Sequence, residues 1–177
     1  VDMGAGWVGV HTGRTNGVMA EAIAAGSIPA LSGYRTLRRE VPYAPRGQAG
    51  GRLDLFLSDG RSPDALVEVK NVTLLDGDWV RFPDAVSERG RKHLDLLHAA
   101  VRDGLRGVIL FAVNRPEGGR FGPAWTIDGA YARRLTEVAS AGVEVLAVRI
   151  EHWSDRLGIG GELLVDLDSP ERDSRGS

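Results

Sequence analysis

The sequence predicts an α/β fold in which a mixed sheet is flanked by helices. Residues 52–58 and 65–72 alternate between apolar and polar side chains around a cluster of turn-forming residues, as the strands of an antiparallel hairpin do. Residues 107–113 are continuously apolar, which is typical of a buried strand. Helical spacing over 87–103 and a capped helical segment over 128–142 separate the later strands.

The first elements are expected to be a short strand and a helix. Residues 7–11 are apolar and predict a strand. Asn16 is a plausible N-cap, and the run that follows it predicts a helix that stops at Gly26. Residues 34–43 have strand character and are rich in arginine.

Two hairpins follow. In the first, the leucines at 53, 55 and 57 fall on one face of the strand at 52–58, which pairs with the strand at 65–72. In the second, Asp76-Gly77 forms the turn and residues 79–82 form the returning strand.

The second half of the chain alternates helices with strands. Ser87 is the expected N-cap of the helix that ends at Gly104, and Asp128 caps the helix that closes at Gly142. Strands are predicted at 143–150 and, at the edge, 161–167. Domain boundaries follow from this order, with a single domain at 1–166 and a polar disordered tail at 167–177.

Composition limits the function classes. The chain has 177 residues, enough for one domain with a sizeable core, and no cysteine, which excludes a disulfide scaffold, a cysteine zinc site, a thiol nucleophile and an iron–sulfur cluster. No apolar run approaches the roughly 20 residues of a membrane helix, and the N-terminus lacks a signal-peptide pattern. We therefore expect a cytoplasmic protein with no membrane partner. The arginines between 33 and 61 form a mildly basic region that by itself is interpreted as a solvated surface.

The first hairpin carries a group of charged residues. If its turn centres on Arg61, Asp54 stands opposite Glu68, with Lys70 on the same face. Carboxylates about 5 Å apart repel by roughly 3 kcal/mol at an effective dielectric of about 20. Protonation of one carboxyl, a neighbouring cation such as Arg52 or Lys70, or a bound metal could each relieve this repulsion. Oxygen ligands this close suit Mg²⁺ or Mn²⁺.

Lysine at position 70 is unusual for this composition. The chain has 22 basic residues, and only Lys70 and Lys92 are lysines. Lysine offers a compact charge and a proton that can be moved, which arginine does not. At position 70 it could orient a water or neutralise charge on a phosphate.

These residues resemble a known family. Asp54 followed by Glu68-Val69-Lys70 on a hairpin resembles the PD-(D/E)XK nuclease superfamily. The segments WVGVHTGRTN, EVKNVTL and FPDAVSERGRKHL are similar to the sugar fermentation stimulation protein family, and the similarity extends from about Trp7 to Leu146. The resemblance implies a restriction-endonuclease-like mixed sheet with an αβββαβ core.

The resemblance also implies a site and a partner. Asp54 and Glu68 would hold Mg²⁺ or Mn²⁺, Lys70 would assist catalysis, and Glu21 on the first helix would complete the acidic set. Non-specific DNA binding through phosphates is implied, with Arg52, Arg89 and Lys92 as the expected contacts. Family members begin with an OB-like domain, which this sequence does not include.

Two functions remain open at the level of sequence. One is a Mg²⁺-dependent nuclease; the alternative is a non-catalytic, sequence-non-specific DNA-binding regulatory factor in sugar (maltose) metabolism. Either function is compatible with a homo-oligomeric protein. On the second helix, His93 is interpreted as a packed or hydrogen-bonded histidine, and Asp84 as a helix cap.

Overall fold

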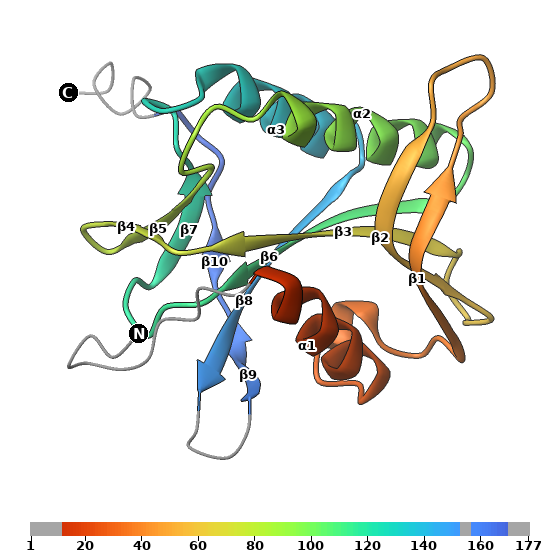
Figure 1. Cartoon of the computed structure of the whole chain (residues 1–177), viewed down its shortest axis with the longest axis horizontal. Coiled ribbons are helices and arrows are strands. Elements are labelled where there is room, and N and C mark those ends of the chain that lie inside the picture. The colour runs from red at the N-terminus through yellow and green to blue at the C-terminus, as the bar shows by residue number, and fades with distance from the viewer. Residues whose placement is uncertain (1–11, 153–156, 170–177) are drawn as a thin grey trace.

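A computed structural model describes residues 12–152 and 157–169 of the chain (Figure 1). The strand predicted at 7–11 and most of the predicted tail, residues 170–177, lie outside these residues. A six-stranded mixed sheet, ordered β1-β2-β3-β6-β8-β9, forms the centre of the molecule. Its strands are β1 (Thr36–Tyr43), β2 (Gly51–Ser58), β3 (Ala65–Val72), β6 (Arg106–Val113), β8 (Glu144–His152) and β9 (Leu157–Glu162).

The strand directions confirm the predicted mixed α/β fold. Strands β1, β2 and β3 pair antiparallel, β3, β6 and β8 pair parallel, and β9 returns antiparallel to β8. The parallel strands are joined through helices, as parallel connections require.

A second, four-stranded sheet was not anticipated. It is ordered β10-β7-β5-β4, and its strands are β4 (Leu74–Asp76), β5 (Trp79–Phe82), β7 (Arg120–Pro123) and β10 (Leu164–Val165). The glycine- and proline-rich sequence at β7 predicts a loop, and its strand form comes from pairing with β5 and β10. The single strand predicted at 161–167 is therefore wrong, because the chain leaves the large sheet after Glu162 and joins the small one at Leu164.

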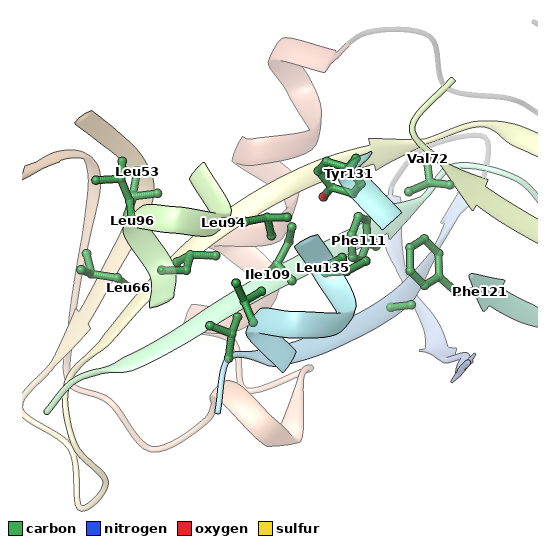
Figure 2. Packing of buried hydrophobic residues seen from close by; sticks show 14 of the residues in the cluster. Leu53, Leu66, Val72, Leu94, Leu96, Ile109, Phe111, Phe121, Tyr131 and Leu135 are labelled. Carbon is green, nitrogen blue, oxygen red and sulfur yellow. The ribbon is translucent and has the colours of Figure 1, made fainter. Parts of the chain in front are cut away.

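Helices cover both faces of the large sheet. Figure 1 shows α1 (Thr12–Ala24) on one face and α2 (Glu88–Arg102) with α3 (Gly129–Ser140) on the other; a short 3₁₀ turn, η1 (Pro29–Leu31), follows α1. Two separate apolar clusters fill these interfaces. Figure 2 shows part of the cluster beneath α2 and α3, which includes Phe111, Phe121 and Tyr131. In the part of the chain that is described, none of the helices has the length and apolar content needed to cross a membrane.

The limits of α1 differ from the prediction at one end. The helix already includes Thr12, so Asn16 lies inside it and is not its N-cap. The Asn16 side chain instead donates to Asp54 on β2. The predicted stop is confirmed: Gly26 has a φ of 73°, in the left-handed region that favours glycine, and its N–H donates to Ile23 O at 3.0 Å.

Both predicted caps of the later helices are confirmed. The Ser87 hydroxyl accepts from Gly90 N at 3.0 Å, and the Asp128 carboxylate accepts from Tyr131 N at 2.9 Å. Asp128 also accepts from Ser87 N at 2.8 Å, so one buried carboxylate joins the starts of α2 and α3. Asp84 is exposed and caps neither helix.

Asp128→Ala is expected to lower the free energy of unfolding by about 1–3 kcal/mol at pH 7, because a buried charged acceptor of several hydrogen bonds is lost. Burial opposes ionisation of Asp128, but the N–H groups of Ser87 and Tyr131 and the charge of Arg91 outweigh burial and lower its pKa below the ordinary 3.8. This contribution is therefore full above pH 3.8 and is lost as the pH falls through the folded pKa.

Urea unfolding at pH 7 and pH 3 measures the free energy of unfolding of Asp128→Ala and of the unaltered chain. The difference between these two proteins should be smaller at pH 3 than at pH 7. Asp95→Asn is the matched control, because Asp95 is an exposed carboxylate paired with Arg134 at 2.7 Å and such pairs contribute at most about 1 kcal/mol. Equal losses in the two variants would contradict the role given to Asp128.

Candidate functional site

The β2–β3 register brings the predicted acids to neighbouring positions. Leu55 pairs with Val67 and Leu57 with Ala65, which confirms the register that the sequence predicts. If this register continued by one more residue, Asp54 would stand opposite Glu68. The backbone pairing of β2 with β3 ends at Leu55, so Asp54 is not paired with Glu68 across the two strands. Its Oδ2 accepts from the backbone N–H of Val69 at 2.8 Å, so the carboxylate lies at the point where the two strands begin to diverge.

Strand β2 changes face at Asp54. Leu53 packs in the cluster beneath α2, whereas Leu55 and Leu57 pack in the cluster against α1, so the prediction of one leucine face is wrong. The neighbouring strand is irregular at the same level: Glu40, at the β1 position across from Asp54, has a φ of 54°. A non-glycine residue in this region interrupts the regular alternation of side chains.

Glu68 lies at the centre of a buried polar cluster. Its side chain is 4% exposed, and Lys70 Nζ donates to its Oε1 at 2.6 Å. Nδ1 of His93, on α2, contacts the same carboxylate oxygen and lies 3.3 Å from Lys70 Nζ. His93 is thus hydrogen-bonded, as predicted. Its partner is Glu68, so His93 also belongs to the polar cluster of the predicted site. The alternative of an exposed acid pair does not apply to Glu68, which is buried.

The surroundings of Asp54 and Glu68 shift the pKa values of the two carboxyl groups in opposite directions. Burial by itself would raise the pKa of Glu68, but the hydrogen bond with His93 and the charge of Lys70 outweigh burial and lower it. Burial, and then the negative charge of Glu68, raise the pKa of Asp54 against the opposing effects of the Val69 N–H and Lys70. Asp54 is therefore the carboxylate whose charge is least compensated, and a cation beside it would stabilise its ionised form.

One oxygen of this cluster has no partner. Oε2 of Glu68 is buried and makes no hydrogen bond with any described residue. An unpaired buried charged oxygen is costly, and a cation is one way to satisfy it. The carboxylates of Asp54 and Glu68, completed by waters, are the oxygen donors that Mg²⁺ or Mn²⁺ prefers, so the residues present fit such an ion.

The third predicted acid is not in the site. Glu21 is exposed on α1, and over residues 12–152 and 157–169 no group of three or more His, Asp or Glu side chains is arranged to hold a metal. Asn16 reaches the site from α1 instead, and its Nδ2 donates to Asp54 Oδ1 at 2.7 Å. The signal for Asn16 is its spacing of three, four and seven residues before the buried Met19, Ala20 and Ile23, which places all four on one helix face.

The predicted DNA-contacting residues lie at the surface. Arg89 and Lys92 are exposed in the first two turns of α2, four residues and one residue before His93, and form no ion pair with another described residue. The Arg52 side chain is 65% exposed and lies 3.8 Å from Glu40, a separation at which an exposed pair contributes little. All three cations are therefore available to a ligand.

Fold and site together define a class of protein. A mixed sheet covered by helices on both faces, with an aspartate and a Glu-x-Lys sequence on two adjacent diverging strands, is a nuclease-like α/β domain. Residues 13–156 match the family described as the sugar fermentation stimulation protein RE domain. The chain belongs to the sugar fermentation stimulation protein family.

Relatives in this family are similar over most of the chain. The sugar fermentation stimulation protein homolog of Acidithiobacillus ferrooxidans (strain ATCC 53993) is 48% identical over 157 residues, which cover 88% of this chain and 66% of the homolog. The homolog of Geobacter sp. (strain M21) is 50% identical over 145 residues, or 82% of this chain and 61% of the homolog. This chain thus spans slightly less than two thirds of the length of these relatives.

A solved structure has the same fold. "The structure of Pyrococcus furiosus SfsA in complex with Ca²⁺" superposes with a TM-score of 0.77 at 30% identity, over 89% of this chain and 66% of that one. Family and fold predictions are therefore both confirmed.

Proposed function

We propose that the chain is a DNA-binding protein with a divalent-metal-dependent phosphodiesterase site. The observation that carries the proposal is the buried Glu68, which pairs with Lys70 through one oxygen and has no partner for the other, next to a strand on which the Val69 N–H holds the Asp54 carboxylate. An acid pair beside one amine is a suitable arrangement for phosphodiester hydrolysis, because it combines a cation site with a positioned proton donor or acceptor.

Each residue would have a separate role. Asp54 and Glu68 would hold Mg²⁺ or Mn²⁺, and such an ion would activate a water and stabilise charge on the phosphate. Lys70, fixed by Glu68 at 2.6 Å, would orient the attacking water or offset phosphate charge. The solved Pyrococcus furiosus SfsA is a complex with Ca²⁺, which supports a divalent-cation site in this family.

DNA would be held by its phosphates. Arg89 and Lys92 lie on the same helix as His93, which contacts Glu68, so exposed positive charge lies within a turn of the polar cluster. Arg52 adds a third exposed cation on the strand that carries Asp54. Contacts of this kind position a backbone without reading sequence, and they predict a steep loss of affinity with salt.

Incubation of supercoiled plasmid with the protein and Mg²⁺ or Mn²⁺ is expected to give metal-dependent nicking, which Asp54→Ala and Lys70→Ala both abolish because they remove a cation ligand and the positioned amine. Agarose gels with and without EDTA measure the result, and retained far-UV circular dichroism shows that the variants fold. Nicking that survives in either variant, or DNA affinity that does not respond to salt, would contradict the proposal.

A second candidate is a non-catalytic DNA-binding regulatory factor in sugar (maltose) metabolism. The observation in its favour is that Lys70 and His93 both contact one oxygen of Glu68, so the protein itself satisfies part of that carboxylate. Retardation of DNA that is equal in Mg²⁺ and EDTA, with no nicking, would support this second function over the first.

A further inference from the structure

Helix α1 presents an amide to the site where a carboxylate was predicted. The half-buried Asn16 donates from Nδ2 to Asp54 Oδ1 at 2.7 Å, while Val69 N donates to Asp54 Oδ2 at 2.8 Å. Each oxygen of the Asp54 carboxylate therefore has one fixed donor, which sets the orientation of the group. Each oxygen also keeps lone-pair capacity for a cation.

A buried polar cluster next to Asn16 fixes the helix that carries it. Thr15, 4% exposed, donates from Oγ1 to Asn71 Oδ1 at 3.1 Å. Nδ2 of Asn114, 3% exposed, donates to the same Asn71 oxygen and lies 3.4 Å from Thr15 Oγ1. Since Asn71 is on β3 and Asn114 follows β6, the cluster joins α1 to two central strands of the sheet. The position of Asn16 is thereby fixed relative to Lys70, which precedes Asn71.

The charges at the site suit one cation. Two carboxylates, Asp54 and Glu68, are accompanied by one fixed positive charge, Lys70. Within the described ranges no third acid joins them, since Glu21 is exposed and Asn16 is neutral. Two-metal sites hold their ions about 4 Å apart, and the two carboxylates with Lys70 leave one net negative charge, which favours one divalent ion over two repelling ones.

We propose that Asn16 is a positioning residue, which orients Asp54 so that the site takes a single divalent cation per chain. This inference rests on the proposed metal site. Because Asn16 acts through Asp54 and not on the reacting atoms, its loss should weaken cation affinity far more than the rate of the cation-loaded protein. Partners that orient a metal ligand typically contribute about 10–100-fold in affinity.

Titration of the full chain with Mn²⁺, with free Mn²⁺ followed by electron paramagnetic resonance, tests the inference without reference to activity. The unaltered chain is expected to bind one Mn²⁺, and Asn16→Ala to bind it about 10–100-fold more weakly. Glu21→Ala, a change on the exposed part of the same helix, should leave Mn²⁺ affinity unchanged. Equal affinity of Asn16→Ala and the unaltered chain, or a loss at Glu21→Ala, would overturn the proposal.

The isosteric change Asn16→Asp tests the charge argument if the alanine variant does not fold. By adding a third carboxylate, it is expected to raise the stoichiometry from one Mn²⁺ towards two; a stoichiometry that stays at one would overturn the charge argument from which the single cation is inferred. In the nicking assay, excess Mn²⁺ should restore Asn16→Ala but not Lys70→Ala, and a failure to restore would make Asn16 merely structural. Two Mn²⁺ on the unaltered chain would overturn this inference alone, whereas no Mn²⁺ binding would overturn the proposed metal site as well.

Discussion

Replacing Lys70 with methionine is expected to reduce Mn²⁺-dependent nicking by about 10²-fold or more, equivalent to about 2.7 kcal/mol of transition-state stabilisation. Methionine keeps an unbranched apolar stem like that of lysine but removes the ammonium group that lies 2.6 Å from Glu68 Oε1. Because the positive charge of Lys70 repels a cation bound to the same carboxylate, Mn²⁺ affinity should stay equal or rise. Single-turnover nicking and Mn²⁺ titration of the same preparation measure the two effects.

Lys92→Met is the matched comparison, because Lys92 is the other lysine of the chain and is exposed on α2. It should weaken DNA affinity with no loss of rate at saturating DNA, since a phosphate contact binds the ground state and the transition state alike. A Lys70→Met variant that nicks at the original rate, or that loses Mn²⁺ binding, would show that Lys70 is not the positioned amine.

Phe111→Ala is expected to be strongly destabilising, with a cost of about 3–5 kcal/mol. Phe111 is fully buried in β6, stacked on Phe121 with ring centroids 4.1 Å apart and tilted against Phe82 at 5.5 Å. Truncation removes these contacts and leaves a cavity that the surrounding strands cannot close. At about 2–4 °C per kcal/mol for a chain of this length, Tm should fall by roughly 6–20 °C.

Phe56→Ala is the matched control, because it is the same Phe→Ala substitution at a less buried position. Phe56 is only partly buried, and one side of its ring is covered by the Arg38 guanidinium at 4.8 Å. Its loss should lower Tm by less than half as much in the same calorimetric scans. A larger effect at Phe56 than at Phe111 would contradict the placement of Phe111 as the more deeply packed ring of the cluster beneath α2 and α3.

Local patterns were reliable where the determining contacts are close in sequence. The alternation around the first hairpin predicted the register Leu55–Val67, because turn length and apolar spacing fix a hairpin within a few residues. The caps at Ser87 and Asp128 were predictable for the same reason, since each accepts from an N–H three residues ahead. The turn of the second hairpin lies one residue later than the predicted Asp76-Gly77: Asp76 pairs with Trp79, so the turn is Gly77-Asp78.

Patterns failed where a distant partner decides the structure. Asn16 reads as a helix cap by residue type, but its partner Asp54 is 38 residues away, and the helix begins earlier. Only the resemblance to the nuclease superfamily places Glu21 in the site, whereas in the structure its side chain is exposed on the solvent-facing side of α1. The interpretation of His93 as hydrogen-bonded was correct, yet only the packing of α2 on the sheet identifies Glu68 as its partner.

Residue patterns predict the order of most helices and strands, the pairing of the first hairpin, and the placement of Asp54, Glu68 and Lys70 on adjacent strands, because side-chain periodicity and turn chemistry act over short distances along the chain. Three features follow from packing and not from these patterns: Asn16 and His93 complete the polar cluster, β2 changes face at Asp54, and the last strands divide between two sheets. Those features depend on which surfaces pack together, and residues separated by 25 to 38 positions carry no local pattern that specifies their contact.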